Sequence, residues 1–140
     1  MAKNVVHLSG EMTKDTALGE GTISPGDLLE RINTGALQRH STAAGKALVM
    51  VALENTPWNK GLSDDYVDGN QIVYGYPQRG AKVSLLLAAS ASAIVKGDYL
   101  ESAGDGTVRV FGSGVALFVA EEAVDNSAGA TKVRIEATAM

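Results

Sequence analysis

The sequence predicts an all-β fold, a small barrel or sandwich with an extended N-terminal arm and an internal hairpin repeat. Two observations predict it: a turn-and-strand pattern that occurs twice, and short apolar stretches bounded by turn residues. The repeat is the stronger of the two. Its positions Ile23, Gly26, Asp27, Leu29, Glu30 and Gly35 recur in the same order and at the same spacing as Ile94, Gly97, Asp98, Leu100, Glu101 and Gly106.

Each copy of the repeat carries the signals of a β-hairpin. A Gly-Asp pair suits the first turn, because Gly tolerates positive φ and an Asp carboxylate accepts hydrogen bonds from nearby backbone N–H groups. Tight turns follow at 33–35 and 104–106, and then an apolar third strand at 47–53 and 115–120. The carboxylates duplicated with this scaffold are interpreted as structural, against the alternative of paired groups for acid/base chemistry: Asp27, Glu30, Asp98 and Glu101.

Residues 1–22 are predicted to form an arm. They are mostly polar, contain several glycines and show no apolar period typical of a helix. Arms of this kind become ordered when a partner offers a sheet edge or a groove. The rest of the chain, 23–140, is interpreted as a single β-rich domain with two related hairpin units, at about 23–54 and 94–122. The apolar patch of the arm consists of Val5, Val6 and Leu8.

Further strands and one long loop are expected around the hairpin units. Residues 46–54 are apolar on both alternating faces, which suits a strand covered on two sides or at a subunit interface, although the residue types also permit a helix. The Gly- and Pro-containing stretch 55–70 must be a loop, and loops of this length are often functional or disordered. A hairpin is expected from strands at 71–76 and 81–87. Alternation in 132–138 predicts a final half-buried strand.

Composition and charge exclude several classes of function. The 140 residues include 12 basic and 16 acidic ones, giving a net charge of −4, so nucleic acid is not an expected partner. The absence of cysteine excludes disulfides, thiolate metal sites and a cysteine nucleophile. No apolar stretch is long enough to span a bilayer, so no membrane partner is expected. Aromatic residues make up only 5% of the chain, which predicts a light core and favours oligomer formation.

No catalytic residue, cofactor or metal is predicted. His7 and His40 have no second ligand at a metal-like spacing, and the sequence contains neither a G-x-S-x-G elbow nor a phosphate-binding glycine motif. The single tryptophan, Trp58, either caps the core or anchors a contact with a partner. The acidic residues of the long loop do not follow the order of a calcium-binding loop and are interpreted as solvated: Asp64, Asp65 and Asp68.

Four segments in the second half carry a resemblance to a known family. They are G-D-Y-L at 97–100, G-T-V at 106–108, G-V-A at 114–116 and A-E-E-A at 120–123. In this order they resemble the capsid decoration, or cement, proteins of tailed double-stranded DNA bacteriophages. The resemblance extends loosely over 23–137 and departs from the pattern at 117–118, where a glycine is common.

The resemblance implies a β-tulip or β-clip-like protomer with no enzymatic activity and no cofactor. It implies assembly in the host cytoplasm and a homotrimer on the outer capsid surface of the virion, bound to the major capsid protein and stabilising contacts between capsomers. The arm would add a strand to a capsid sheet. Two other classes stay open: a nucleotide hydrolase on a β-clip-like scaffold, and a phage tail or carbohydrate-binding module.

Two sets of residues are expected to carry these contacts. The expected capsid-binding residues are Val5, Val6, Leu8 and Trp58. The expected residues of the trimer interface are Leu48, Val49, Met50, Leu117 and Phe118.

Overall fold

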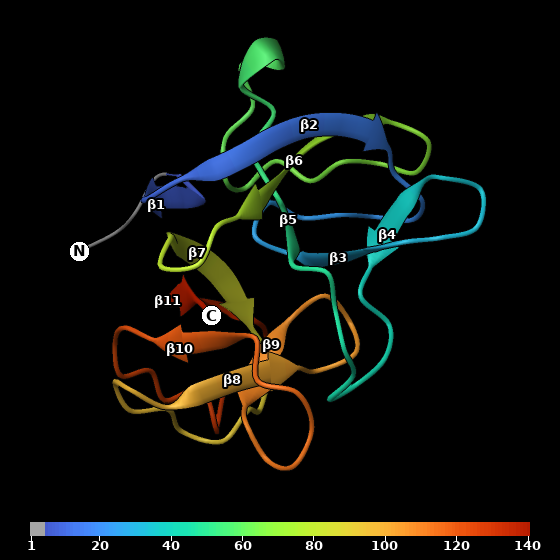
Figure 1. Ribbon diagram of the computed structural model, residues 1–140. Helices are drawn as coiled ribbons and strands as arrows, with labels where there is room; N and C mark the ends of the chain where they lie inside the picture. Colours follow the sequence, from blue (N-terminus) through green and yellow to red (C-terminus); the bar gives the residue numbers. More distant parts are fainter. Residues whose placement is uncertain (1–4) are drawn as a thin grey trace.

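The computed structural model describes residues 5–140, and almost all of its regular structure is β-strand (Figure 1). The described residues contain eleven strands and one short 3-10 turn, η1 (Thr56–Trp58). The predicted all-β class is confirmed. In chain order the strands are β1 (His7–Ser9), β2 (Met12–Leu18), β3 (Leu28–Arg31), β4 (Leu37–Arg39), β5 (Met50–Ala52), β6 (Gln71–Pro77), β7 (Lys82–Leu87), β8 (Tyr99–Ser102), β9 (Val108–Val110), β10 (Phe118–Ala120) and β11 (Val133–Ala139).

Two units of five strands share one topology. The first unit has the strand order β2-β6-β5-β3-β4, and the second has the order β7-β11-β10-β8-β9. Each strand of the first unit therefore corresponds to the strand five places later in the chain. β1 joins the second unit, where it pairs with the first residues of β7. The units lie one above the other in Figure 1, with the first at the top.

The same parallel contact occurs in both units. In the second unit β7 pairs with β9 through Leu87 and Val108, which closes the sheet into a five-stranded barrel. In the first unit the equivalent bridge joins Gly19, just after β2, to Leu37 of β4. In each unit the residue that follows the bridge donates its N–H to the carbonyl oxygen of the bridged residue on the other strand. The acceptor is Leu37 in the first unit, over 2.8 Å, and Val108 in the second, over 3.0 Å. The duplication thus extends beyond the hairpin units that the sequence predicts.

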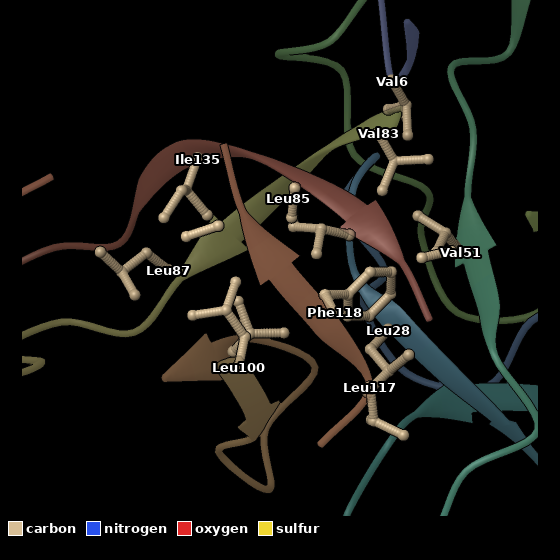
Figure 2. Close-up of a cluster of buried hydrophobic side chains, with 14 of the residues drawn as sticks. Val6, Leu28, Val51, Val83, Leu85, Leu87, Leu100, Leu117, Phe118 and Ile135 are labelled. Atoms are coloured by element: carbon tan, nitrogen blue, oxygen red, sulfur yellow. The ribbon is translucent and has the colours of Figure 1, made fainter. Parts of the chain in front are cut away.

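Each unit has an apolar interior, and the interior of the second continues into the junction between the units (Figure 2). Leu28 and Val51 belong to strands of the first unit and are fully buried. They nevertheless belong to one buried cluster with Val83 and Phe118 of the second unit. Burial of apolar side chains is the main favourable term in folding. The units are therefore joined by apolar packing as well as by the chain.

The segment predicted as an arm contributes two strands to the sheets. β2 pairs with β6 along all seven of its residues, and β1 pairs with β7. Of the apolar patch, Val6 is fully buried by the chain itself. The polar character of β2 has a simple cause, because most of its side chains face solvent at the edge of the first sheet. The prediction of a separate arm is therefore wrong from Val6 onward. Residues 1–4 of the predicted arm lie outside the described residues.

The strands predicted at 71–76 and 81–87 coincide with β6 and β7, but the hairpin predicted from them is wrong. β6 pairs with β2 and β5, whereas β7 pairs with β1, β9 and β11. The turn between them connects the two units. Turn residues between two apolar strands look the same in sequence whether the strands pair with each other or with other partners.

The loop predicted at 55–70 contains η1 and one isolated bridge, between Ile23 and Tyr66. Tyr66 fastens this loop to the first unit. Its side chain is buried, and its hydroxyl donates a hydrogen bond to the carbonyl oxygen of Leu53 over 2.6 Å. Part of the loop therefore belongs to the core, and only its tip projects from the molecule (Figure 1).

Candidate interaction surfaces

The Asp carboxylates of the repeat close its turns. Asp27 Oδ2 accepts the N–H of Ser24 over 2.7 Å. In the second unit Asp98 Oδ2 accepts the N–H of Val95 over 3.0 Å. The Asp side chain thus mimics a backbone turn in both units, as its position after glycine predicts.

The Glu carboxylates of the repeat hold the loops that follow the hairpins. Glu30 accepts a hydrogen bond from Gln38 over 2.8 Å and one from the backbone of the next loop over 3.2 Å. Glu101 accepts the N–H of Gly112 over 2.8 Å and the Nε–H of Arg109 over 3.0 Å. These hydrogen bonds hold the pKa of Glu101 below its ordinary value, with the Gly112 N–H as the largest cause. All four duplicated carboxylates therefore have structural partners.

Asp27 has a second function at the junction between the units. It is fully buried, and its Oδ2 accepts the Nε–H of Arg39 over 2.6 Å, while Lys132 Nζ lies 4.0 Å from Oδ1. Burial raises the pKa of Asp27, and the hydrogen bond from Arg39 opposes that shift. From β11, Arg134 donates to the carbonyl oxygen of Pro25 over 2.5 Å. This charged cluster ties the first Gly-Asp turn to the second unit.

The histidines are held by hydrogen bonds within the chain. His40 is buried, donates from Nε2 to the carbonyl oxygen of Lys46 over 2.9 Å, and has Nδ1 2.7 Å from Ser102 Oγ. His7 donates from Nε2 to the carbonyl oxygen of Gly10 over 2.7 Å. Over residues 5–140, no three His, Asp or Glu side chains are grouped so as to hold a metal ion. The same residues include no helix with the length and apolarity needed to cross a membrane.

Trp58 is the most exposed large apolar residue of the chain's described part. It is 75% exposed at the end of η1, which projects at the top of Figure 1. Beside it lies an open hollow of about 410 Å³. The hollow is lined by Asn55, Trp58, Lys60, Asn70 and Gln71. Of the two roles expected for this tryptophan, the geometry favours the contact anchor over the core cap.

The other residues expected to bind the capsid differ in exposure. Val5 is exposed and Leu8 is half-buried, so both have surface to offer. Val6 is not available, because it lies in the core and its carbonyl oxygen accepts the N–H of Ser84 over 2.8 Å. The prediction that Val6 contacts a capsid is therefore wrong.

Three of the five residues expected at a trimer interface are buried within the chain: Met50, Leu117 and Phe118. Met50 lies inside the first unit, whereas Leu117 and Phe118 lie at the junction (Figure 2). The prediction that they form a trimer interface is wrong, because the chain itself buries all three side chains. Leu48 is 69% exposed and Val49 is half-buried, so these two stay candidates.

An exposed apolar surface that sequence reasoning missed lies on the second unit. We call it the β8 face, and it consists of Val95, Tyr99, Phe111 and Val119. Tyr99 and Phe111 are 51% and 36% exposed, and their rings meet edge to face with centroids 6.4 Å apart. Val119 lies opposite Tyr99 on β10, and Val95 is in the turn before β8. The signal in the sequence was Tyr99 itself, an aromatic residue where the first copy of the repeat has Leu28.

These features define an all-β protein built from two tandem five-stranded units, with the carboxylates of the repeat engaged in turns and loops and with apolar residues exposed at separate places. A solved structure with a similar fold is the N base of head fiber gp8.5 of bacteriophage phi29. The likeness has a TM-score of 0.61 and 14% sequence identity, and it covers 93% of this chain and 95% of that chain. At this identity the likeness establishes the fold. No protein-family model matches the sequence, and no curated protein does.

Proposed function

We propose that this chain is a structural protein of a bacteriophage head that binds the major capsid protein on the outer surface and acts as a homotrimer. The observation that carries the proposal is the fold, which is similar over nearly the whole of both chains to the base of a phage head fiber. A base of this kind has to hold its place by contacts and needs no chemistry. The proposed role is decoration of the head, with reinforcement of contacts between capsomers.

The arrangement of carboxylates supports a structural role over a hydrolase. A nucleotide hydrolase would require carboxylates free to bind a metal ion and a basic grip for phosphate. Here Asp27, Glu30, Asp98 and Glu101 accept hydrogen bonds from the chain's own turns and loops.

Trp58 is the proposed anchor on the capsid. Tryptophan is enriched among the residues that dominate interface energetics, and this one stands at the tip of a projecting turn. Val5 and Leu8 lie on the N-terminal segment and are proposed as secondary contacts. Three copies bound together would convert modest single contacts into tight attachment.

The proposal is tested by co-sedimentation of the purified protein with heads of the parent phage prepared without it. We expect wild-type protein to sediment with the heads, and Trp58→Ala to weaken attachment by about tenfold or more. Leu18→Ala is the matched control, because Leu18 is also an exposed apolar residue of the first unit. If wild-type protein stays in the supernatant, the head is not its partner; if Trp58→Ala binds as wild type does, the anchor lies elsewhere.

A carbohydrate-binding module is the second candidate, and the hollow beside Trp58 favours it. Three amide side chains and Lys60 line that hollow next to an exposed indole. The amides and the lysine suit the hydroxyls of a sugar, and the indole suits the apolar face of its ring. Binding of the protein to a glycan array, abolished by Trp58→Ala, would support this candidate. Absence of glycan binding, together with head attachment, would remove it.

A further inference from the structure

The β8 face has an exact positional counterpart in the first unit. By the repeat, the shared strand register and the matching backbone hydrogen bonds, Val95, Tyr99, Phe111 and Val119 correspond to Ser24, Leu28, His40 and Val51. All four residues in the first unit are buried, with at most 4% of their surface exposed. In the second unit Val95 is 61% exposed, and the two aromatic rings also face solvent. One face is therefore covered and its counterpart is open.

The cover of the first face is the second unit of the same chain. Leu28 lies beside Leu117, just before β10, and beside Phe118, the first residue of β10 (Figure 2). Val51 lies near Phe118 and Val83. This is a contact between the outer face of one five-stranded unit and the end of another. Because both units have the same topology, a further unit of this kind would fit the β8 face in the same way.

We propose that the β8 face is covered by a second copy of this chain, in a head-to-tail contact that repeats the junction within the chain. The inference rests on the homotrimer of the proposed function and names its interface. Exposed apolar surface of this kind marks interaction sites on soluble proteins. The two edge-to-face rings at the centre, Tyr99 and Phe111, are the type of residue that dominates interface energetics.

The counterpart surface on the second copy follows from the same correspondence. In the first unit, Leu48 and Val49 stand before β5 where Ala116 and Leu117 stand before β10. Val49, the residue equivalent to Leu117, is half-buried, and Leu48 beside it is well exposed, so this segment is free to meet Tyr99 of a neighbouring copy as Leu117 meets Leu28 within the chain. Such a contact is heterologous, and a heterologous contact closes into a ring when the rotation between copies permits. In a ring of three copies, every β8 face is covered by a neighbouring copy.

The first experiment measures the oligomeric state by native mass spectrometry and sedimentation equilibrium. Wild-type protein is expected to be a trimer, and the double variant Tyr99→Ser, Phe111→Ser is expected to be a monomer with an unchanged circular dichroism spectrum. The matched control is Leu18→Ser, Val67→Ser, which removes two exposed apolar side chains from the first unit and is expected to stay a trimer. A wild-type monomer at high concentration, or a double variant that stays trimeric, would overturn the inference.

The second experiment uses the absence of cysteine from the chain. Tyr99→Cys protein and Leu48→Cys protein are mixed under mild oxidation, and a disulfide between the two variants is expected. Leu18→Cys replaces Leu48→Cys as the control and is expected to give no mixed product. A product formed only between two Tyr99→Cys chains would mean a symmetric face-to-face contact and would overturn the head-to-tail arrangement.

The same proteins separate this inference from the proposed attachment to heads. A wild-type trimer that does not sediment with heads would refute the attachment and leave the β8 interface standing. A wild-type monomer that sediments with heads would refute the interface and leave the attachment standing.

Discussion

The two Gly-Asp turns have nearly the same sequence and the same backbone hydrogen bonds, yet their surroundings differ. In both units the glycine N–H donates over 2.8 Å to a carbonyl oxygen on the third strand after the turn, from Gly26 to Ala52 of β5 and from Gly97 to Ala120 of β10. The first turn is buried against the second unit, and the second turn faces solvent. The duplication therefore preserves backbone geometry, whereas the outward-facing side chains differ according to what each face contacts.

The interiors of the units are filled by residues of different size at equivalent positions. Inside the first unit Tyr74 on β6 supplies bulk, and the equivalent residue on β11 is Ala137. At another position the larger residue is in the second unit, because Leu87 stands where the first unit has Gly19. A Cβ on Gly19 would lie only 2.9 Å from Ile72 Cγ2, so the first unit has no room there. In a close-packed interior, each side-chain volume depends on the atoms around it.

The largest predicted contrast is between two equivalent positions, Leu28 and Tyr99. Leu28→Ala is expected to lower the free energy of unfolding by about 3 kcal/mol, because the side chain is fully buried at the junction. Tyr99→Ala is expected to cost less than about 1 kcal/mol in dilute monomeric protein, since half of its side chain already faces solvent. Urea unfolding at low protein concentration measures both. Equal losses would mean that the two faces are equally covered within one chain.

The second contrast uses the two turn carboxylates. Asp27→Ala is expected to cost about 2 to 3 kcal/mol, because it removes hydrogen bonds to a buried charged group and leaves Arg39 without its ion-pair partner. Asp98→Ala loses chiefly the turn hydrogen bond at the surface and is expected to cost about 1 kcal/mol. Thermal or urea unfolding distinguishes them. A cost at Asp98 as large as that at Asp27 would contradict the assignment of Asp27 to the junction.

The repeat made the class of fold and the hairpin turns predictable, because turn residues act locally. Glycines at positive φ, among them Gly26 and Gly97 with φ of 95°, require the same conformation in both copies. The pairing of β6 and β7 was not predictable in this way. Which strand pairs with which depends on contacts between distant segments, and β2, polar and at the sheet edge, gave little apolar signal to show its pairing with β6.

The candidate surfaces were predictable only in part, for a related reason. Trp58 stood out, since a lone tryptophan in a long loop is a local signal. The apolar strand around Met50 indicated that both of its sides are covered, but the sequence could not tell a second unit of the chain from a second subunit. The β8 face became visible only when each of its residues was compared with its buried equivalent.

A smaller effect is expected from Glu101→Gln, and it depends on pH. The variant is expected to lose about 1.5 kcal/mol at pH 7, because the charge-assisted hydrogen bonds from Arg109 and Gly112 weaken. The pKa of Glu101 is lowered in the folded state, so its contribution is present at neutral pH and is lost as the pH falls through that lowered pKa. The gap between wild type and variant should therefore narrow on acidification, as urea unfolding across a pH series would show. A gap that stays constant would argue against a charged Glu101.

The smallest effect is expected at Trp58, in contrast with Tyr66 of the same loop. Trp58→Ala is expected to change the free energy of unfolding by less than about 0.5 kcal/mol, because the indole is mostly exposed. Tyr66→Phe is expected to cost about 1 kcal/mol, since it leaves the buried carbonyl oxygen of Leu53 without its hydroxyl donor. The two unfolding curves separate the part of the loop that belongs to the core from the part available to a partner. A larger loss at Trp58 than at Tyr66 would make the tryptophan a cap on the core and remove it as the proposed anchor.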